Sequence, residues 1–276
     1  MASLLAFPCI APHGGVALEE LGNPRAARAE GTRRAMAELR ERARRAALDA
    51  WIVLAPHGIR VAGCMAVSDA EAAVALLEPE GDAGRRLRFE AAVHRDMACA
   101  LAERSLARGV PAVRVTDGRG CYPMDWSGAI PLWFLGAGRD QAGALPVVQV
   151  VPSTDLGWQG MVRFGQILGA FCEERPERIG LIASSDLAHA HDPQGPYGRH
   201  AAAAAYDSAV CEAIEANDPM RLLSFEPDTV RDARVDGQWQ ILALAGALLA
   251  RPTPLELLCY EVPTYFGMLT AGPRAS

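Results

Sequence analysis

Short apolar runs alternate with longer segments of helical periodicity along this chain of 276 residues. The run at 51–54 is continuously apolar and ends in a Pro-His-Gly turn, which is typical of a strand buried on both faces of a sheet. Residues 158–174 place Met161, Phe164 and Leu168 on one face of a helix. Helices are predicted over 25–49, 85–107, 158–174, 199–216 and 238–250, and strands over 51–54, 112–115, 145–151 and 179–183.

This alternation of strands and helices predicts an α/β fold with a mostly parallel central sheet and helices on both of its faces. The closing apolar stretches at 255–262 and 265–271 are expected to form an antiparallel pair at the edge of that sheet. No long linker rich in Pro, Gly or Ser divides the chain, so we expect one domain over residues 1–276.

The charged residues exclude several classes of mechanism. All 27 basic residues are arginines, and the absence of lysine excludes a Schiff base, a lysine general base and a phosphate-binding loop of the Walker type. The formal net charge of −6 argues against nucleic acid as a partner. The arginines at 25–49 are interleaved with Glu30, Glu38 and Glu41, as on a solvated helix face.

The apolar runs are shorter than the roughly 20 residues that cross a bilayer, and the N-terminus lacks the basic region of a signal peptide. Seven cysteines are scattered without a CxxC pair, which is typical of a reducing compartment. We therefore expect a cytoplasmic protein with no membrane partner.

A repeated phrase carries the first candidate chemistry. An apolar residue followed by Ala-Pro-His-Gly occurs around His13 and again around His57, 44 residues later. Both copies follow an apolar run, so both histidines are expected just beyond the carboxyl end of a strand, where open α/β sheets bind ligands. Imidazole is the commonest metal ligand, so the pair predicts a shared metal site. Two unrelated turns of similar composition are the alternative.

A second polar segment follows the predicted strand at 179–183. Two serines, two aspartates and two histidines crowd residues 184–192, and a loop rich in Pro and Gly comes next. Either His189 or His191 could face the same pocket, and the spacing alone does not choose between them. A polar surface loop with two solvated histidines is the alternative. His94 and His200 lie in helical patterns and are expected at the surface or in the core.

A third ligand is needed to complete a metal site, and four carboxylates are candidates: Asp125, Asp186, Asp236 and Glu261. Asp236 immediately precedes the predicted helix at 238–250, where helix capping would explain it equally well. Composition alone favours the four carboxylates almost equally as the third ligand. Arg60, just beyond His57, could bind a carboxylate of the substrate.

Several segments together resemble the class III extradiol ring-cleavage dioxygenases, the superfamily of the protocatechuate 4,5-dioxygenase catalytic subunit, and within it the Memo-like branch. The matching segments, in order, are PHGG at 12–15, PHG at 56–58, SSDLAH at 184–189 and YEVPTYFGM at 260–268. In addition, DWSG at 125–128 followed by IPL at 130–132 is similar to the family's Asp-His-Gly and Val-Pro-Leu segment.

The resemblance implies that His13 and His57 bind a metal, that Asp236 is the third ligand and that His189 is the acid/base residue. Family members carry a glutamate or a cysteine at the position of Asp236, and aspartate still completes a facial triad of two histidines and one carboxylate. Trp126 stands where a histidine is common, so one polar contact to the substrate is missing. The expected substrate contacts are His191, Asp125, Trp126, Arg60 and Tyr265.

The function implied is that of a dioxygenase that uses Fe(II), with Zn²⁺ or Mn²⁺ as alternatives, and O2 to open a catechol or aminophenol ring next to its two heteroatoms, giving a semialdehyde acid. His189 would take a proton from the substrate hydroxyl and return one later. Two other functions compete: a zinc-dependent hydrolase and a non-enzymatic Memo-like protein that binds a metal or a peptide. We expect a homodimer, with a separate small subunit as the alternative.

Overall fold

A central sheet runs through the computed structural model, which describes residues 5–79, 84–138, 140–141 and 144–274. Within these residues the sheet has eight strands in the order β10-β11-β1-β9-β2-β8-β3-β6. The strands are β1 Leu5–Ala11, β2 Ala50–Leu54, β3 Met65–Ser68, β6 Ala112–Val115, β8 Val147–Val151, β9 Ile179–Ser184, β10 Leu255–Glu261 and β11 Met268–Pro273. Strands β1, β9, β2 and β8 are parallel, and β11 pairs antiparallel with β1 at one side and with β10 at the other. The predicted α/β class, the mostly parallel sheet and the antiparallel closing strands are confirmed.

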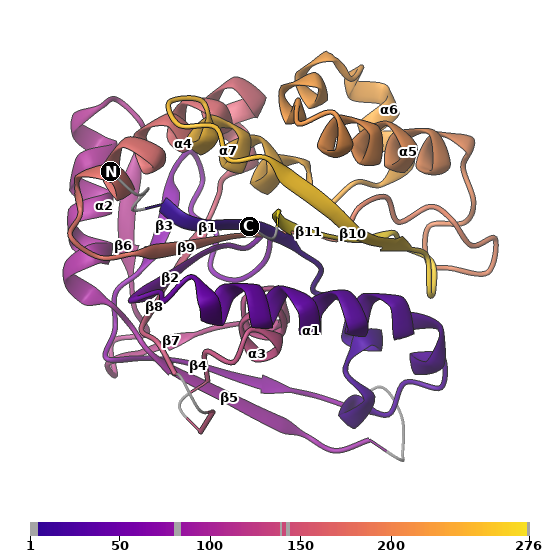
Figure 1. The fold of residues 1–276 in the computed structure, drawn as a ribbon, viewed down its shortest axis with the longest axis horizontal. Coiled ribbons are helices and arrows are strands. Elements are labelled where there is room, and N and C mark those ends of the chain that lie inside the picture. Colours follow the sequence, from indigo (N-terminus) through magenta and orange to yellow (C-terminus); the bar gives the residue numbers. More distant parts are fainter. Residues whose placement is uncertain (1–4, 80–83, 139, 142–143, 275–276) are drawn as a thin grey trace.

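Helices cover both faces of this sheet (Figure 1). They are α1 Glu30–Arg45, α2 Arg95–Ala107, α3 Trp126–Phe134, α4 Gly157–Glu174, α5 Ala201–Glu215, α6 Pro227–Ala233 and α7 Gln238–Leu248. Short 3-10 helices lie in the connections between elements: η1 Gly15–Ala17, η2 Glu19–Leu21, η3 Ala26–Ala29, η4 Thr154–Leu156 and η5 Pro219–Ser224. In Figure 1, α4 and α7 lie on one side of the sheet, and α1 and α3 lie on the other.

Side chains of the central strands point alternately to the two faces of the sheet and pack into two hydrophobic cores. In β2, Ile52 and Leu54 belong to the core under α4 and α7, whereas Trp51 and Val53 belong to the core under α1 and α3. All five residues of β2 are buried. Successive side chains of a strand point to opposite faces, so only a strand buried on both sides needs an uninterrupted apolar run.

The predicted helix over 85–107 is wrong in its first part. A strand, β5 Leu87–Ala92, precedes α2 and pairs antiparallel with β4 Ala72–Leu77, which pairs parallel with β7 Cys121–Pro123. These form a second sheet, whose strands the sequence prediction missed along with β3. Leu87, Phe89 and Ala91 are buried whereas Arg88 and Ala92 are exposed, the two-residue period of a strand with one covered face.

Other predicted boundaries shift by a few residues. The helix expected from residue 25 begins at Glu30, because η3 fills residues 26–29. His94 and His200 are N-cap residues: their side chains accept hydrogen bonds from the backbone N–H groups of Met97 and Ala202, at the starts of α2 and α5. No helix of the described ranges combines the length and the apolar character required to span a bilayer.

Candidate metal centre

The two Pro-His-Gly turns meet at one edge of the central sheet. His13 lies two residues beyond the end of β1, and His57 lies three residues beyond the end of β2. Strand β9 pairs in parallel with both, so its own exit, the segment from Ser184 to His189, opens between them. The carboxyl ends of parallel strands share one edge, and the predicted proximity of the two histidines therefore follows from the strand order. Their ring centroids are 5.5 Å apart.

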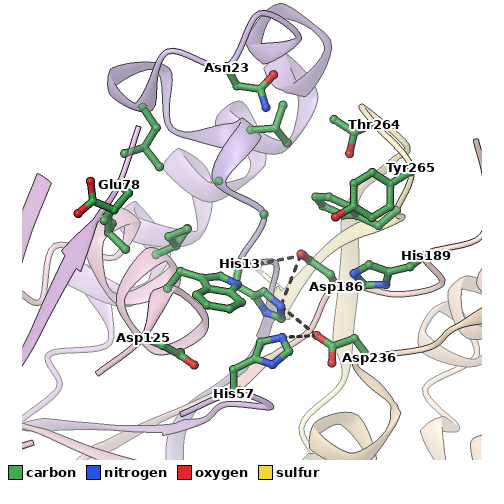
Figure 2. Close-up of a pocket in the computed structure, with 18 of the residues that line it drawn as sticks. His13, Asn23, His57, Glu78, Asp125, Asp186, His189, Asp236, Thr264 and Tyr265 are labelled. Atoms are coloured by element: carbon green, nitrogen blue, oxygen red, sulfur yellow. Dashed lines mark hydrogen bonds and ion pairs between the residues drawn. The ribbon is translucent and has the colours of Figure 1, made fainter. Parts of the chain in front are cut away.

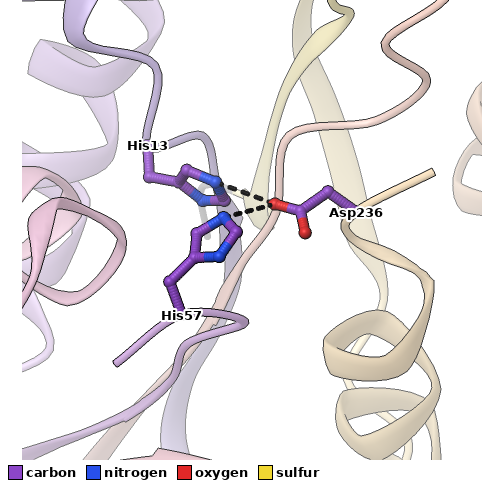
Figure 3. A group of neighbouring side chains, drawn as sticks. All are labelled: His13, His57 and Asp236. Carbon is purple, nitrogen blue, oxygen red and sulfur yellow. Dashed lines mark hydrogen bonds and ion pairs between the residues drawn. The ribbon is translucent and has the colours of Figure 1, made fainter. Parts of the chain in front are cut away.

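Asp236 comes from a different part of the chain, the short connection between α6 and α7, and its side chain points at both imidazoles (Figure 3). Its Oδ2 atom lies 3.1 Å from Nε2 of His13 and 3.2 Å from Nε2 of His57. The N-cap residue of α7 is Gly237, and no side chain caps this helix. Asp236 is thus not a helix cap, and among the four candidate carboxylates it is the one in contact with both histidines.

The three side chains fit a single bound cation. One ligand atom from each of His13, His57 and Asp236 lies within 4.8 Å of the others. Ligand atoms with metal bonds of about 2.1 Å lie roughly 3.0 Å apart at right angles and roughly 3.4 Å apart in a tetrahedron. The measured 3.1 and 3.2 Å fall between these values. Two imidazoles and one carboxylate are also the donor set of a facial triad.

Hydrogen bonds orient the His13 ring for this role. The Ser184 hydroxyl donates to the Ser127 carbonyl oxygen at 2.5 Å, so its own oxygen accepts from Nδ1–H of His13 at 3.0 Å. Nδ1 therefore carries a proton, and Nε2 is directed at Asp236. The hydrogen bond from Nδ1–H to Ser184 would keep the orientation of the His13 ring when the proton on Nε2 is exchanged for a metal ion.

The charges around the centre are strongly coupled. Burial alone would lower the pKa of His13, but the carboxylates of Asp186 and Asp236 outweigh it and raise the pKa above the usual 6.5. Burial would raise the pKa of Asp236, but hydrogen bonds from His13 and His57 outweigh it and hold that pKa far below its usual range. Asp236 is therefore ionised, and a cation is favoured at the position between it and the imidazoles.

A second carboxylate, Asp186, lies behind His13. It is 2% exposed, accepts a hydrogen bond from the His13 backbone N–H at 3.0 Å and lies 3.6 Å from His13 Nε2. Burial raises the pKa of this carboxyl group. Asp186 fixes the backbone of the first histidine, whereas Glu261, the remaining candidate, accepts from the Thr32 backbone N–H and lies outside the site.

His189 lies near Asp186 and on the same side of the two metal-site histidines as Asp236 (Figure 2). Its Nδ1 lies 3.0 Å from the Leu187 carbonyl oxygen, which can only accept, so Nδ1 carries the proton and Nε2 is the basic nitrogen. Its ring stacks on Phe266 at 5.1 Å between centroids, and Tyr265 packs beside both rings. The imidazole thus has one fixed tautomer and one fixed orientation.

A cleft of about 1310 Å³ opens over these residues. Three of the predicted substrate contacts, Asp125, Trp126 and Tyr265, line it. Asp125 also caps α3 by accepting from Ser127 N–H at 2.9 Å, and the Trp126 ring lies 4.9 Å from the His57 ring. Trp126 is 50% exposed, so its ring forms part of the cleft wall and is not buried in the core.

The other two predicted contacts lie elsewhere. His191 turns away from the cleft, and its Nε2 lies 2.8 Å from Oδ2 of the buried Asp207. The Arg60 guanidinium donates to the Pro56 carbonyl oxygen and does not line the cleft. The sequence prediction missed Tyr197, Arg234 and Phe266, which do line it. Phe266 belongs to the matched segment at 260–268, whereas Tyr197 and Arg234 lie in loops without a motif.

Comparisons with known proteins identify a family and support the fold. The family model described as the catalytic LigB subunit of aromatic ring-opening dioxygenase matches residues 9–264. Protein CA_C1420 of Clostridium acetobutylicum is 22% identical over 259 residues; the match covers 91% of this chain and 53% of that protein, so the chain spans about half the length of this curated relative. The crystal structure of uncharacterized protein JW3007 from Escherichia coli K12 has the same fold, with a TM-score of 0.64 at 16% identity over 98% of this chain and 100% of that one.

Proposed function

Because this chain belongs to the family of the catalytic LigB subunit of aromatic ring-opening dioxygenases, we propose that it is an Fe(II)-dependent extradiol dioxygenase acting on a catechol- or aminophenol-type ring. The observation that carries the proposal is the convergence of His13, His57 and Asp236 at the floor of a cleft whose wall holds His189. Two neutral donors and one carboxylate leave coordination positions for substrate and O2.

His13, His57 and Asp236 would hold the iron, which supplies the electron transfer between aromatic substrate and O2 that the ring opening requires. The protein residues do the rest. The two strand-end turns and the buried Asp186 fix the positions of the imidazoles, and the ionised Asp236 balances the charge of the cation. Trp126, packed against His57, limits access of water on that side.

His189 would act as the acid/base residue. Its Nδ1–H is committed to the Leu187 carbonyl oxygen, so Nε2 is available to accept a proton from a substrate hydroxyl and to return it to the product. Stacking on Phe266 keeps the ring from turning during this exchange. A neutral imidazole suits both directions of transfer near neutral pH.

The proposal is tested by anaerobic reconstitution with Fe(II), Mn²⁺ or Zn²⁺, followed by a panel of catechols and aminophenols. The iron-loaded protein is expected to consume one O2 per substrate and to form a yellow ring-opened product. Activity with zinc and none with iron would contradict the proposal, as would the absence of turnover across the whole panel.

Three variants separate the roles of the site residues. His13→Ala and His57→Ala should lose the metal, as measured by equilibrium dialysis, because each removes one of three ligands. His189→Ala should keep the metal but lose about 10²- to 10⁴-fold in kcat. His200→Ala, at a helix cap outside the cleft, is the matched control and should retain both. Loss of metal in His189→Ala would refute its assignment as an acid/base residue.

A further inference from the structure

The cleft is larger than one aromatic ring requires. Its volume of about 1310 Å³ exceeds the roughly 300–1,000 Å³ typical of sites that bind drug-sized ligands. Its walls differ in charge. Glu78 and Asp125 lie on one side of the metal centre, and the basic residues Arg25 and Arg234 line the cleft as well. A substrate that fills this space therefore extends beyond the ring that is opened.

Of the two basic side chains, Arg25 already has an acidic partner. Its guanidinium lies 3.6 Å from Oδ2 of Asp192. Arg234 differs: among the residues that the structure describes, no carboxylate pairs with its guanidinium, which lies 5.8 Å above the Tyr197 ring. A cation held over an aromatic face has its hydrogen-bond donors directed outward and available.

The backbone of Arg234 ties it to the catalytic geometry. Arg234 ends α6 in the left-handed backbone conformation, with φ 57° and ψ 53°, which residues other than glycine rarely adopt. Its carbonyl oxygen accepts from the His189 backbone N–H at 3.1 Å, and Asp236 follows two residues later. The strained turn thus places a cation next to both the acid/base histidine and the third metal ligand.

We propose that Arg234 is a specificity-determining residue that binds a carboxylate carried on an arm of the aromatic substrate. The inference rests on the proposed function and names its substrate class: a catechol or aminophenol whose ring bears an extended, anionic substituent. Arginine matches a carboxylate through two parallel hydrogen bonds, and the contacting aromatic rings of Tyr197 and Tyr265 line the same cleft as the arginine and the metal centre. The carboxylates of Glu78 and Asp125, which also line the cleft, disfavour the same group beside them.

The test compares one substrate pair on the metal-loaded protein: a catechol with a carboxylate at the end of a short alkyl chain, and its methyl ester. Anaerobic calorimetry measures binding, and turnover in air gives kcat and KM. The wild type should prefer the acid. Arg234→Gln should weaken acid binding and raise its KM about 10- to 100-fold, leaving kcat and the ester nearly unchanged. Arg234→Lys should keep part of the preference.

Two further variants make the result specific. Arg231→Gln, three residues earlier on α6, removes an arginine that pairs with Asp228 and Asp232 outside the cleft, and it should retain the preference for the acid. Arg60→Gln tests the alternative arginine. The proposal is overturned if the wild type binds acid and ester equally or binds neither, if Arg234→Gln keeps the preference, or if Arg60→Gln loses it. Selective anaerobic binding without turnover would instead contradict the dioxygenase function and leave the role of Arg234 intact.

Discussion

Asp207 on α5 holds together the loop that carries His189, the proposed acid/base residue, and its removal should destabilise the fold measurably. The side chain is completely buried. Its Oδ1 accepts from the Ala188 backbone N–H at 3.0 Å, and its Oδ2 accepts from His191 Nε2 at 2.8 Å and from the Tyr260 hydroxyl at 2.7 Å. Burial, with Asp207 beside it, raises the pKa of Tyr260, so this hydroxyl stays protonated and donates.

Asp207→Ala leaves these three donors without their acceptor. The Ala188 N–H lies in a residue with no exposed surface, and such an orphaned donor costs roughly 1–3 kcal/mol. His191 and Tyr260 are partly exposed, so water can replace the lost bond at a smaller penalty, roughly 0.5–1.5 kcal/mol each. Relief of the buried carboxylate's desolvation offsets part of the sum. We expect a net loss of about 3 kcal/mol in the free energy of unfolding.

Asp207→Asn is the matched control. Its amide oxygen can still accept from Ala188 N–H, and its NH2 group can donate to the Tyr260 oxygen, so a loss of about 1 kcal/mol is expected. Urea unfolding of the metal-free protein, followed by tryptophan fluorescence, measures both values. The reasoning is refuted if Asp207→Ala loses less than about 1 kcal/mol, or if the asparagine variant loses as much as the alanine variant.

Two other predictions concern packing and protonation. A Cβ atom on Gly246 of α7 would lie 2.2 Å from the Val162 carbonyl oxygen of α4. Although alanine is favoured over glycine in helices by about 1 kcal/mol, this clash should dominate, and Gly246→Ala should lower the melting temperature by an amount equivalent to about 2 kcal/mol. A higher melting temperature would contradict the prediction. The raised pKa of His13 means that the folded metal-free protein binds this proton more tightly than the unfolded chain, so the stabilisation is complete below pH 6.5 and declines as the pH rises through the folded-state value. Urea titrations from pH 6 to 9 should show this slope, His13→Gln should remove it, and an equal slope in both proteins would argue against it.

The fold could be predicted from the sequence wherever burial imposes a period. Strand β2 is apolar throughout because both of its faces are covered, and α4 repeats apolar residues at helical spacing because one face is covered. The helix predicted over 85–107 failed for a related reason. The segment Leu87–Ala92 alternates in burial, but six residues are a weak signal, and what stabilises them as a strand is the pairing with β4, which the local pattern does not show.

The site residues also divide into those that local sequence patterns could predict and those that they could not. His13 and His57 follow strands whose ends meet at one sheet edge, so their proximity could be inferred from two local patterns. Asp236 could not be separated from Asp186 by composition, because both are acidic residues in loops next to buried elements. Arg234 gave no signal at all: its position in the cleft depends on a left-handed turn at the end of α6 and on contacts with a loop 45 residues earlier in the chain.

Backbone contacts hold the segment that carries Asp236. Val235 forms an antiparallel bridge with Ala188, the Asp236 N–H donates to the Leu187 carbonyl oxygen at 3.3 Å, and the α7 helix that follows is capped without a side chain. The carboxylate itself contacts both His13 and His57, as expected if Asp236 is the third ligand of the proposed metal site. Backbone hydrogen bonds thus join the segment of His189, the proposed acid/base residue, to the segment of Asp236, the proposed metal ligand.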